Sequence, residues 1–266
     1  MKTIRVVVHG ALGRVGKEVV NAVCGDPETK LVGAVDINLK QDFLPVPGNS
    51  ETVPLSSDVE SIITSTKPDV MIDFSLAKAA VPAAHIAIKH KVHLVIGTTG
   101  ISQANLEEID RFARANKVGV VVASNFALGA VLMIHLAKIA ARYFDYAEII
   151  ELHHHLKADA PSGTALTTAR AMAKSRGKPF VLPSEKDTSL KSRGEQVEGI
   201  SVHSIRLPGL LAHQEVILGI AGQTLTIRHD TTSRECYTPG VLLAVKEVMK
   251  HQGLISGLAP ILGIED

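Results

Sequence analysis

The sequence predicts an α/β protein, with a Rossmann-like doubly wound parallel sheet and a second α+β domain built on a mixed or antiparallel sheet. Three observations support this fold class. Apolar runs alternate with helical stretches in the first half, a glycine-rich turn follows the first run, and strand-like runs succeed one another after residue 200. Alternating strands and helices build right-handed βαβ units, whereas strands in series favour antiparallel pairing.

The first half of the chain shows the alternation in detail. Residues 4–8 form a continuous β-branched run, which is typical of a strand buried on both faces. Residues 42–54 are rich in proline, glycine and polar side chains and are predicted to form an irregular loop. The other predicted strands span 31–35, 70–74, 92–96 and 118–122, and the predicted helices span 14–24, 59–66, 79–90 and 103–116.

The second half has a different order of predicted helices and strands. The pattern predicts helices at 128–142, 163–175 and 241–250, strands at 147–152, 200–207, 215–220 and 224–229, and a polar surface loop at 176–199. The last helix resembles those of the first half, so the chain is expected to return to the first domain. The predicted domains are therefore residues 1–126 with 235–266, which bind a dinucleotide, and residues 127–234.

Composition limits the classes of function. The 266 residues suit two small domains. A net charge of +1, 3% aromatic residues and no Trp disfavour a nucleic acid or an acidic membrane surface as partner. The apolar stretch 118–141 is interrupted by polar residues, which favours a strand and a helix over a membrane span.

The start of the chain and the cysteines bear on its compartment. The first apolar run enters a glycine motif with Arg14 and Lys17 instead of the small-residue cleavage site of a signal peptide. Cys24 and Cys236 are isolated and form no zinc pattern. Two such thiols indicate a reducing compartment, so we expect a cytoplasmic protein.

The glycine motif lies between the first strand and the first helix. Gly10, Gly13 and Gly16 form a GxxGxxG pattern. Glycines allow a sharp turn and bring bare backbone N–H groups against a pyrophosphate at a helix N-terminus, and Arg14 adds a cation. A tight strand-to-helix turn with no ligand has the same spacing, and the triplet alone does not separate the two.

Asp36 improves the case for a dinucleotide. It ends the second predicted strand, where a carboxylate can accept hydrogen bonds from an adenosine ribose diol. The same charge repels a 2′-phosphate, and Ile37 and Asn38 follow instead of an arginine. The sequence therefore favours NADH over NADPH, although Lys40 could contact a phosphate. The alternative is a solvated turn residue.

Two more short motifs follow predicted strands of the first domain. They are Gly97-Thr98-Thr99-Gly100 and Ser124-Asn125-Phe126. Ligands of open α/β sheets gather at the carboxyl ends of strands, and small hydroxyl residues suit the close passage of a nicotinamide ribose. A turn followed by a helix cap is the alternative for both.

Residues 151–165 carry the sharpest chemical pattern. His153, His154 and His155 are adjacent, and neighbours on an extended chain point to opposite faces, which disfavours one shared metal ion. Histidine exchanges protons near neutral pH, and the Lys157 ammonium can meet a carboxylate or protonate a nitrogen. Ser162 is a candidate N-cap, after which the N–H groups of Gly163 and Thr164 would form a carboxylate site. A plain helix start beside solvated histidines is the alternative.

The pattern Glu-x-His-His-x-x-Lys-x-Asp-Ala-Pro-Ser-Gly-Thr-Ala, which starts at Glu151, resembles the signature of the dihydrodipicolinate reductase family. Other segments that resemble the family are the GxxGxxG turn, Asp73-Phe74-Ser75, the Gly-Thr-Thr-Gly turn, Ala-Ser-Asn-Phe, Ser204-x-Arg206, His213-x-Glu215-Val216, and residues 229–234 followed by Gly240. The resemblance therefore extends over nearly the whole chain.

The resemblance implies an activity and a role for each matching residue. It implies NAD(P)H-dependent reduction of 4-hydroxy-tetrahydrodipicolinate, a cyclic dicarboxylate, in lysine and diaminopimelate biosynthesis, by a homotetramer assembled through the second domain. His153 would protonate the substrate carbon, Lys157 would donate near the ring nitrogen, and His154, Ser162, Gly163 and Thr164 would contact substrate. The cofactor would be lined by Gly10, Ala11, Leu12, Gly13, Arg14, Val15, Asp36, Gly97, Thr98, Thr99, Ala123, Ser124, Asn125 and Phe126.

The chain departs from the family pattern at three places. Leu156 replaces a polar residue of some members, Ile37 replaces an arginine that some members have after the acidic residue, and residues 209–212 are more apolar. Two alternatives stay open: another two-domain NAD(P)-dependent dehydrogenase, and a non-catalytic NAD(H)-binding relative. The His-His-x-x-Lys pattern counts against the first, and the intact His153, Lys157 and helix start count against the second.

Overall fold

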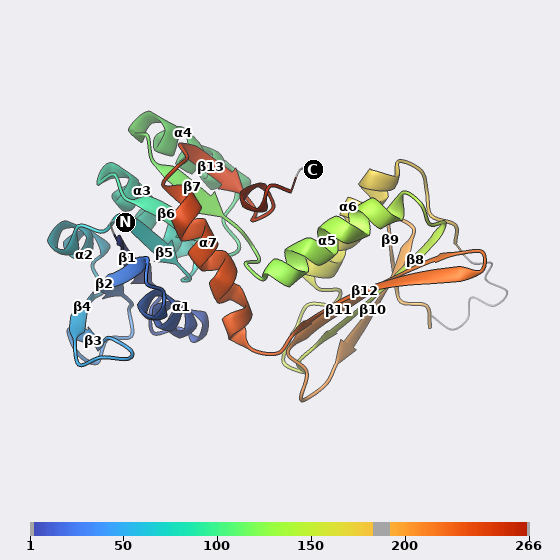
Figure 1. Ribbon diagram of the computed structural model, residues 1–266, viewed down its shortest axis with the longest axis horizontal. Helices are drawn as coiled ribbons and strands as arrows, with labels where there is room; N and C mark the ends of the chain where they lie inside the picture. Colours follow the sequence, from blue (N-terminus) through green and yellow to red (C-terminus); the bar gives the residue numbers. More distant parts are fainter. Residues whose placement is uncertain (1–2, 183–191, 265–266) are drawn as a thin grey trace. The chain divides into compact units, whose positions relative to one another are not determined.

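The computed structural model describes residues 3–182 and 192–264 of the chain. The chain divides into two compact units, Met1–Leu128 with Arg234–Asp266 and Gly129–Ser233 (Figure 1). The predicted domain ranges, 1–126 with 235–266 and 127–234, differ from these units by one or two residues at each boundary. The binding roles assigned to the two domains stay predictions.

The first unit contains an eight-stranded sheet in the order β13-β7-β6-β5-β1-β2-β4-β3. All neighbouring strands pair in parallel except β3 and β4. The strands are β1 (Ile4–His9), β2 (Thr29–Val35), β3 (Phe43–Pro45), β4 (Thr52–Ser56), β5 (Val70–Asp73), β6 (His93–Ile96), β7 (Gly119–Val122) and β13 (Gly253–Ser256). The predicted doubly wound, Rossmann-like sheet is confirmed.

Helices cover both faces of this sheet (Figure 1). The helices α2 (Val59–Thr66), α3 (Ala77–Lys89) and α4 (Gln103–Asn116) contact one another in series, whereas α1 (Arg14–Gly25) contacts α7 (Thr238–Val248). The strand core is fully buried, as the β-branched runs predict: Val6, Val7 and Val8 of β1 have no exposed surface. The strand order reverses between β1 and β5, which makes the crevice at their carboxyl ends the expected place for a ligand.

The glycine turn is dictated by close packing. Gly10 has a φ of +78°, a left-handed conformation that favours glycine, and a Cβ there would lie 2.4 Å from the Phe74 carbonyl oxygen. A Cβ on Gly16 would lie 2.0 Å from the Gly10 carbonyl oxygen. The helix α1 can therefore start against the turn only because both positions lack a side chain.

The second unit contains a five-stranded mixed sheet in the order β12-β11-β8-β10-β9. The central strand β8 (Tyr146–His153) pairs in parallel with β10 (Ile200–Arg206) and antiparallel with β11 (Ala212–Ile220). The outer strands are also antiparallel to their neighbours: β12 (Gln223–Thr231) pairs with β11, and β9 (Glu195–Val197) pairs with β10. Helices α5 (Leu128–Ala141) and α6 (Gly163–Arg176) pack on one face of the sheet around Ile149, Met172 and Val216. This confirms the predicted mixed α+β architecture.

Three parts of the secondary-structure prediction are wrong. Residues 42–54 do not form only a loop, because β3 and β4 pair there; Pro45 and Pro54 obscured these strands, and β3 lies at the sheet edge, where proline is tolerated. The predicted loop 176–199 contains β9, and its residues 183–191 lie outside the described residues. The short strand β13 after α7 was missed.

We predict that Gly16→Ala lowers the free energy of unfolding by about 2 kcal/mol or more, because its Cβ would overlap the Gly10 carbonyl oxygen. Urea denaturation followed by circular dichroism measures this loss. Gly25→Ala is the matched control in the same helix, since a Cβ there meets no heavy atom within 4 Å; it should be neutral or stabilise by up to about 1 kcal/mol. Equal effects of the two variants would contradict the packing argument.

Candidate active site

The predicted cofactor residues gather at the carboxyl edge of the first unit's sheet. The glycine turn follows β1, Asp36 follows β2, and the two short motifs follow β6 and β7. These strands lie within the order β7-β6-β5-β1-β2, and parallel strands end at the same edge. The residues brought together there are Gly10, Ala11, Leu12, Gly13, Arg14, Val15, Asp36, Gly97, Thr98, Thr99, Ala123, Ser124, Asn125 and Phe126.

The start of α1 fits an anionic group. Its N-cap residue, Gly13, provides no side-chain cap, and the first turn carries no acidic residue while Arg14 is exposed. Helices α2 and α4 differ, because Asp58 and Ser102 cap their first N–H groups. The uncapped N–H groups of α1 can therefore donate hydrogen bonds to a phosphate, as the dinucleotide prediction requires.

Asp36 lies beside the glycine turn and helps to hold it. The carboxylate is 6% exposed and accepts hydrogen bonds from the backbone N–H of Leu12 at 2.9 Å and of Asn38 at 3.0 Å. Oδ1 also accepts from the side-chain amide of Asn38 at 3.3 Å, so Oδ2 is the oxygen with room for a further donor, such as a ribose hydroxyl. Ile37 follows with 78% of its surface exposed, so no cation stands directly after the acidic residue.

The motif after β7 can contact a ligand mainly through its backbone and its two polar side chains. Ala123 and Phe126 are almost fully buried, and the Phe126 ring packs against Phe74 with 5.8 Å between ring centroids. Ser124 is exposed, whereas the Asn125 side chain accepts a hydrogen bond from the backbone N–H of Ala127. The side chains of Ala123 and Phe126 therefore belong to the core.

The second unit holds the predicted catalytic residues around one buried carboxylate. Glu151, in β8, has no exposed surface, and its Oε2 lies 2.5 Å from Nδ1 of His153. The guanidinium of Arg206, in β10, donates to both carboxylate oxygens at 2.8 and 2.7 Å. The backbone N–H of Ser162 donates to Oε1 at 3.1 Å. One side chain thus joins the His153 ring, a cation and the start of α6.

These donors keep Glu151 ionised. Burial alone would raise its pKa, but hydrogen bonds from His153, Arg206 and Ser204 outweigh burial and lower the pKa to about 2. An ionised carboxylate accepts the Nδ1–H of His153, which fixes the ring orientation and the tautomer. The proton-exchanging atom of His153 is then Nε2, and Glu151 stabilises the ring when it carries a second proton.

Lys157 is held in the loop between β8 and α6. Its Nζ lies 2.7 and 2.8 Å from the two carboxylate oxygens of Asp159, and this hydrogen bond lowers the pKa of Asp159. Asp159 is 60% exposed, so the pair is weak, worth about 0–1 kcal/mol. An anionic ligand can therefore replace Asp159 as the partner of the ammonium group.

The start of α6 has free space in front of it. Ser162 is buried, as a cap should be, and its Oγ accepts from the backbone N–H of Ala165. The backbone N–H groups of Gly163 and Thr164 have no acceptor within the described residues. A Cβ on Gly163 would meet no heavy atom within 4 Å. These two N–H groups can bind a carboxylate, and the fold itself does not require glycine there.

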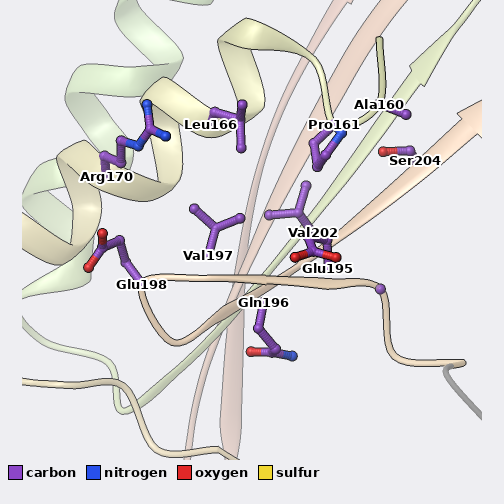
Figure 2. Close-up of a pocket in the computed structure, with 11 residues that line it drawn as sticks. Ala160, Pro161, Leu166, Arg170, Glu195, Gln196, Val197, Glu198, Val202 and Ser204 are labelled. Atoms are coloured by element: carbon purple, nitrogen blue, oxygen red, sulfur yellow. The ribbon is translucent and has the colours of Figure 1, made fainter. Parts of the chain in front are cut away.

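A cavity of about 650 Å³ lies beside this loop (Figure 2). Its lining includes Pro161 from the loop, Arg170 from α6, and Glu195 and Glu198 from the β9 region. The predicted catalytic residues do not line it. Two carboxylates against one guanidinium disfavour a dicarboxylate ligand, so we do not assign the substrate to this cavity.

Two residues of this site, Glu151 and Arg206, were part of the family pattern but received no role from the sequence. The signal for Glu151 was present, because residues two apart on a strand point to the same face. Arg206 lies 55 positions after Glu151 in the sequence, and only the parallel pairing of β10 with β8 places it opposite His153. His154 lies at the end of β8 with its N–H directed to the Leu211 carbonyl oxygen, while His155 and Leu156 are exposed.

Neither a membrane span nor a metal cluster occurs in the part of the chain that the structure describes. No helix there is long and apolar enough to cross a membrane. No three His, Cys, Asp or Glu side chains there are arranged to hold a metal ion.

The fold and the two groups of residues define a two-domain, Rossmann-type oxidoreductase. Comparison with known proteins makes this specific. Residues 4–126 match the family model "Dihydrodipicolinate reductase, N-terminus", and residues 129–262 match "Dihydrodipicolinate reductase, C-terminus". The chain belongs to the dihydrodipicolinate reductase family.

Relatives of known name agree over the full length. The 4-hydroxy-tetrahydrodipicolinate reductase of Dehalococcoides mccartyi is 55% identical over 98% of this chain and 99% of its own. The enzyme of that name from Moorella thermoacetica is 48% identical over 98% of both chains. The solved structure of dipicolinate-bound dihydrodipicolinate reductase from Paenisporosarcina sp. TG-14 has 40% identity and a TM-score of 0.87, and covers 97% of this chain and 99% of that one.

We predict a pH-dependent stability contribution from Glu151. Its folded-state pKa of about 2 lies below the ordinary value of 4.5, so the contribution is complete above about pH 5 and is lost as the pH falls towards 2. The free energy of unfolding of wild type should exceed that of Glu151→Gln by roughly 3 kcal/mol at pH 6, and this difference should shrink steadily on acidification. Urea denaturation between pH 2.5 and 6 measures it.

Glu148→Gln serves as the control for that experiment. Glu148 lies on the same strand but is 39% exposed, so its ion pairs should contribute less than about 1 kcal/mol. A pH-independent difference between wild type and Glu151→Gln would contradict the assigned ionisation.

Proposed function

We propose that the chain catalyses the NAD(P)H-dependent reduction of 4-hydroxy-tetrahydrodipicolinate to tetrahydrodipicolinate, in lysine and diaminopimelate biosynthesis. The observation that carries this function is the joining of His153, Arg206 and the α6 start by the buried Glu151 carboxylate. The relatives named for this activity match the chain from end to end.

The second unit supplies groups for a cyclic dicarboxylate. The N–H groups of Gly163 and Thr164 bind one carboxylate at the positive end of α6, and the Lys157 ammonium lies in the loop that precedes them. The solved relative is described as dipicolinate-bound, and dipicolinate is a flat ring with two carboxylates. His154, at the end of β8, contacts the same ligand.

The reaction replaces the hydroxyl group of the substrate by one hydride, and the hydroxyl group takes up a proton and leaves as water. A ring carbon releases a proton in this elimination and regains one after hydride transfer. A bound reduced nicotinamide supplies the hydride. His153 donates a proton to the substrate carbon from Nε2, because Nδ1 is committed to Glu151. Lys157 exchanges Asp159 for the substrate and provides the proton near the ring nitrogen. Glu151 holds His153 and the α6 start in one arrangement, so the proton donor and the carboxylate site stay aligned.

The first unit binds NADH in preference to NADPH. The uncapped start of α1 takes the pyrophosphate, and Asp36 accepts hydrogen bonds from the adenosine ribose. A 2′-phosphate would meet the Asp36 carboxylate, and the exposed Ile37 offers no compensating charge. Lys40, four residues after Asp36, is exposed and is the nearest cation that follows Asp36 in the sequence.

The active form is a homotetramer assembled through the second unit. Helices α5 and α6 cover one face of its sheet, which buries Ile149. Residues of the opposite face, such as Ile150, Leu152 and Ile217, are only partly buried within the chain. Charged pairs, Glu148 with Arg193 and Glu215 with Arg228, accompany these apolar side chains on the same face. A sheet face with this mixture of apolar and charged groups supports burial against other subunits.

We predict that His153→Gln and Lys157→Met each lower kcat by about 10²- to 10⁴-fold, because each removes a proton donor. The assay follows NADH absorbance with substrate freshly made from pyruvate and aspartate semialdehyde by the preceding synthase. His155→Gln is the matched control, since His155 is exposed and has no assigned role; its kcat should stay within threefold of wild type. Wild type that binds NADH but does not oxidise it would contradict the proposed function.

We predict that wild type uses NADH with a higher kcat/KM than NADPH, and that Ile37→Arg raises kcat/KM for NADPH by about tenfold, because a guanidinium pairs with phosphate. Steady-state kinetics with both cofactors measure this. Lys40→Ala tests the alternative cation: it should change NADPH use by less than twofold. A wild type that prefers NADPH would contradict the role given to Asp36.

A further inference from the structure

A second buried carboxylate lies in the first unit, outside the groups that the proposed reaction uses. Asp73 ends β5 with 1% of its surface exposed, and its neighbours His9 and Thr98 are each 6% exposed. His9 immediately precedes the glycine turn, and Thr98 lies in the Gly-Thr-Thr-Gly turn after β6. The three residues therefore end or follow three adjacent strands.

Donors surround the Asp73 carboxylate. Nδ1 of His9 lies 2.5 Å from Oδ2, and the Thr98 hydroxyl donates to Oδ1. Ser75 donates to Oδ1 from its backbone N–H at 3.2 Å and from its hydroxyl at 3.0 Å. The Ser75 N–H also donates to the Thr98 hydroxyl at 2.8 Å. We call His9, Asp73, Ser75 and Thr98 the switch-point cluster.

The cluster lies where the strand order reverses. His9 is the register partner of Asp73 across β1 and β5, and Asp73 is the partner of Ile96, two residues before Thr98. The crevice at such a reversal is the usual ligand site of an open α/β sheet. The cluster therefore links the turn assigned to the pyrophosphate with the turn assigned to the nicotinamide ribose.

The two turns have different supports. The glycine turn is also anchored to β2, because the N–H groups of Gly10 and Ala11 donate to the Val35 carbonyl oxygen. The turn after β6 is anchored to Asp73 instead: the Gly97 N–H donates to the Asp73 carbonyl oxygen at 2.8 Å, and the Thr98 side chain is held by Asp73 and Ser75 among the described residues. Loss of the cluster should therefore displace the Thr98 turn and leave the glycine turn in place.

Phe74 packs closely against both turns. A Cβ on Gly97 would lie 2.2 Å from the Phe74 ring, and a Cβ on Gly10 would lie 2.4 Å from the Phe74 carbonyl oxygen. Both turns thus rest on the residue directly after Asp73. A shift of Asp73 would move Phe74 and, through it, the backbone at Gly97.

We propose that His9 and Asp73 are positioning residues that hold the Gly97–Thr98 turn at a fixed distance from the glycine turn. One dinucleotide can then bind to both turns, at its pyrophosphate and at its nicotinamide end. A purely stabilising role does not call for such a cluster, because well-packed apolar residues often stabilise as well as buried polar groups do. Since this role concerns hydride delivery, it rests on the proposed function.

Matched variants separate positioning from stability. His9→Asn keeps a donor near the place of Nδ1, whereas His9→Leu removes it, and Thr98→Val removes the hydroxyl at nearly constant size. His93→Leu is the structural control. His93 is the first residue of β6, at the end of the strand away from the turns, and its Nδ1 accepts from the Gly119 N–H at 2.9 Å. This control should lower the Tm without touching the turns.

The main readout is binding, measured by calorimetry with NADH and with ADP, which reaches only the glycine turn and Asp36. For His9→Leu and Thr98→Val we expect a Kd for NADH about tenfold higher and a Kd for ADP within threefold of wild type. His9→Asn should recover most of the NADH affinity. His93→Leu should bind both ligands as wild type does.

The isotope effect on turnover with 4,4-dideuterated NADH is the second readout. Misplaced nicotinamide slows hydride transfer, so His9→Leu should lower kcat by about tenfold or more and raise the isotope effect above that of wild type. Loss of folded protein alone would lower the rate and leave the isotope effect unchanged. Equal NADH binding and equal isotope effects in His9→Leu and His93→Leu would overturn the positioning role.

The two binding measurements need no substrate, so they remain decisive even if the proposed reaction is not observed. A wild type that turns over normally while His9→Leu and Thr98→Val keep wild-type Kd values would refute the positioning role alone. If His9→Leu does not fold, Thr98→Val gives the same test.

Discussion

The buried charge of Glu151 is the interaction on which the second unit's site depends. A carboxylate without exposed surface is tolerated only when donors surround it, and here the donors come from three places in the chain: the end of β8, β10, and the loop that enters α6. Satisfying this one group therefore fixes the ring of His153, the guanidinium of Arg206 and the helix start together.

The first unit solves a similar problem with backbone geometry. A parallel sheet brings the ends of its strands to one edge, and glycines at Gly10 and Gly16 let the chain turn there without side-chain collisions. The polar groups at that edge are shared between neighbouring loops, so Asp36 holds the glycine turn and Asp73 holds the turn after β6. Two of the loops at this edge thus have a carboxylate behind them.

Much of this arrangement follows from local sequence. The alternation of apolar runs and helices predicts the parallel sheet, and the residues around His153 and Ser162 predict a proton donor beside a helix start. Pairings between distant segments are harder, because no local signal states which strands become neighbours: Arg206 meets Glu151, and His9 meets Asp73, only through the sheet register. Short edge strands such as β3, β9 and β13 are also weakly encoded, since three or four residues give too little periodicity to recognise.

The first unit is built from two separate stretches of the chain, and this has a consequence for biosynthesis. Its last elements, α7 and β13, are encoded after the whole of Gly129–Ser233. A ribosome therefore releases every strand of the second sheet before α7 can pack on α1 and before β13 can pair with β7. Because domains generally fold as units during synthesis, the inserted unit completes its core first, and the nucleotide-binding sheet keeps an open edge at β7 until β13 has been translated.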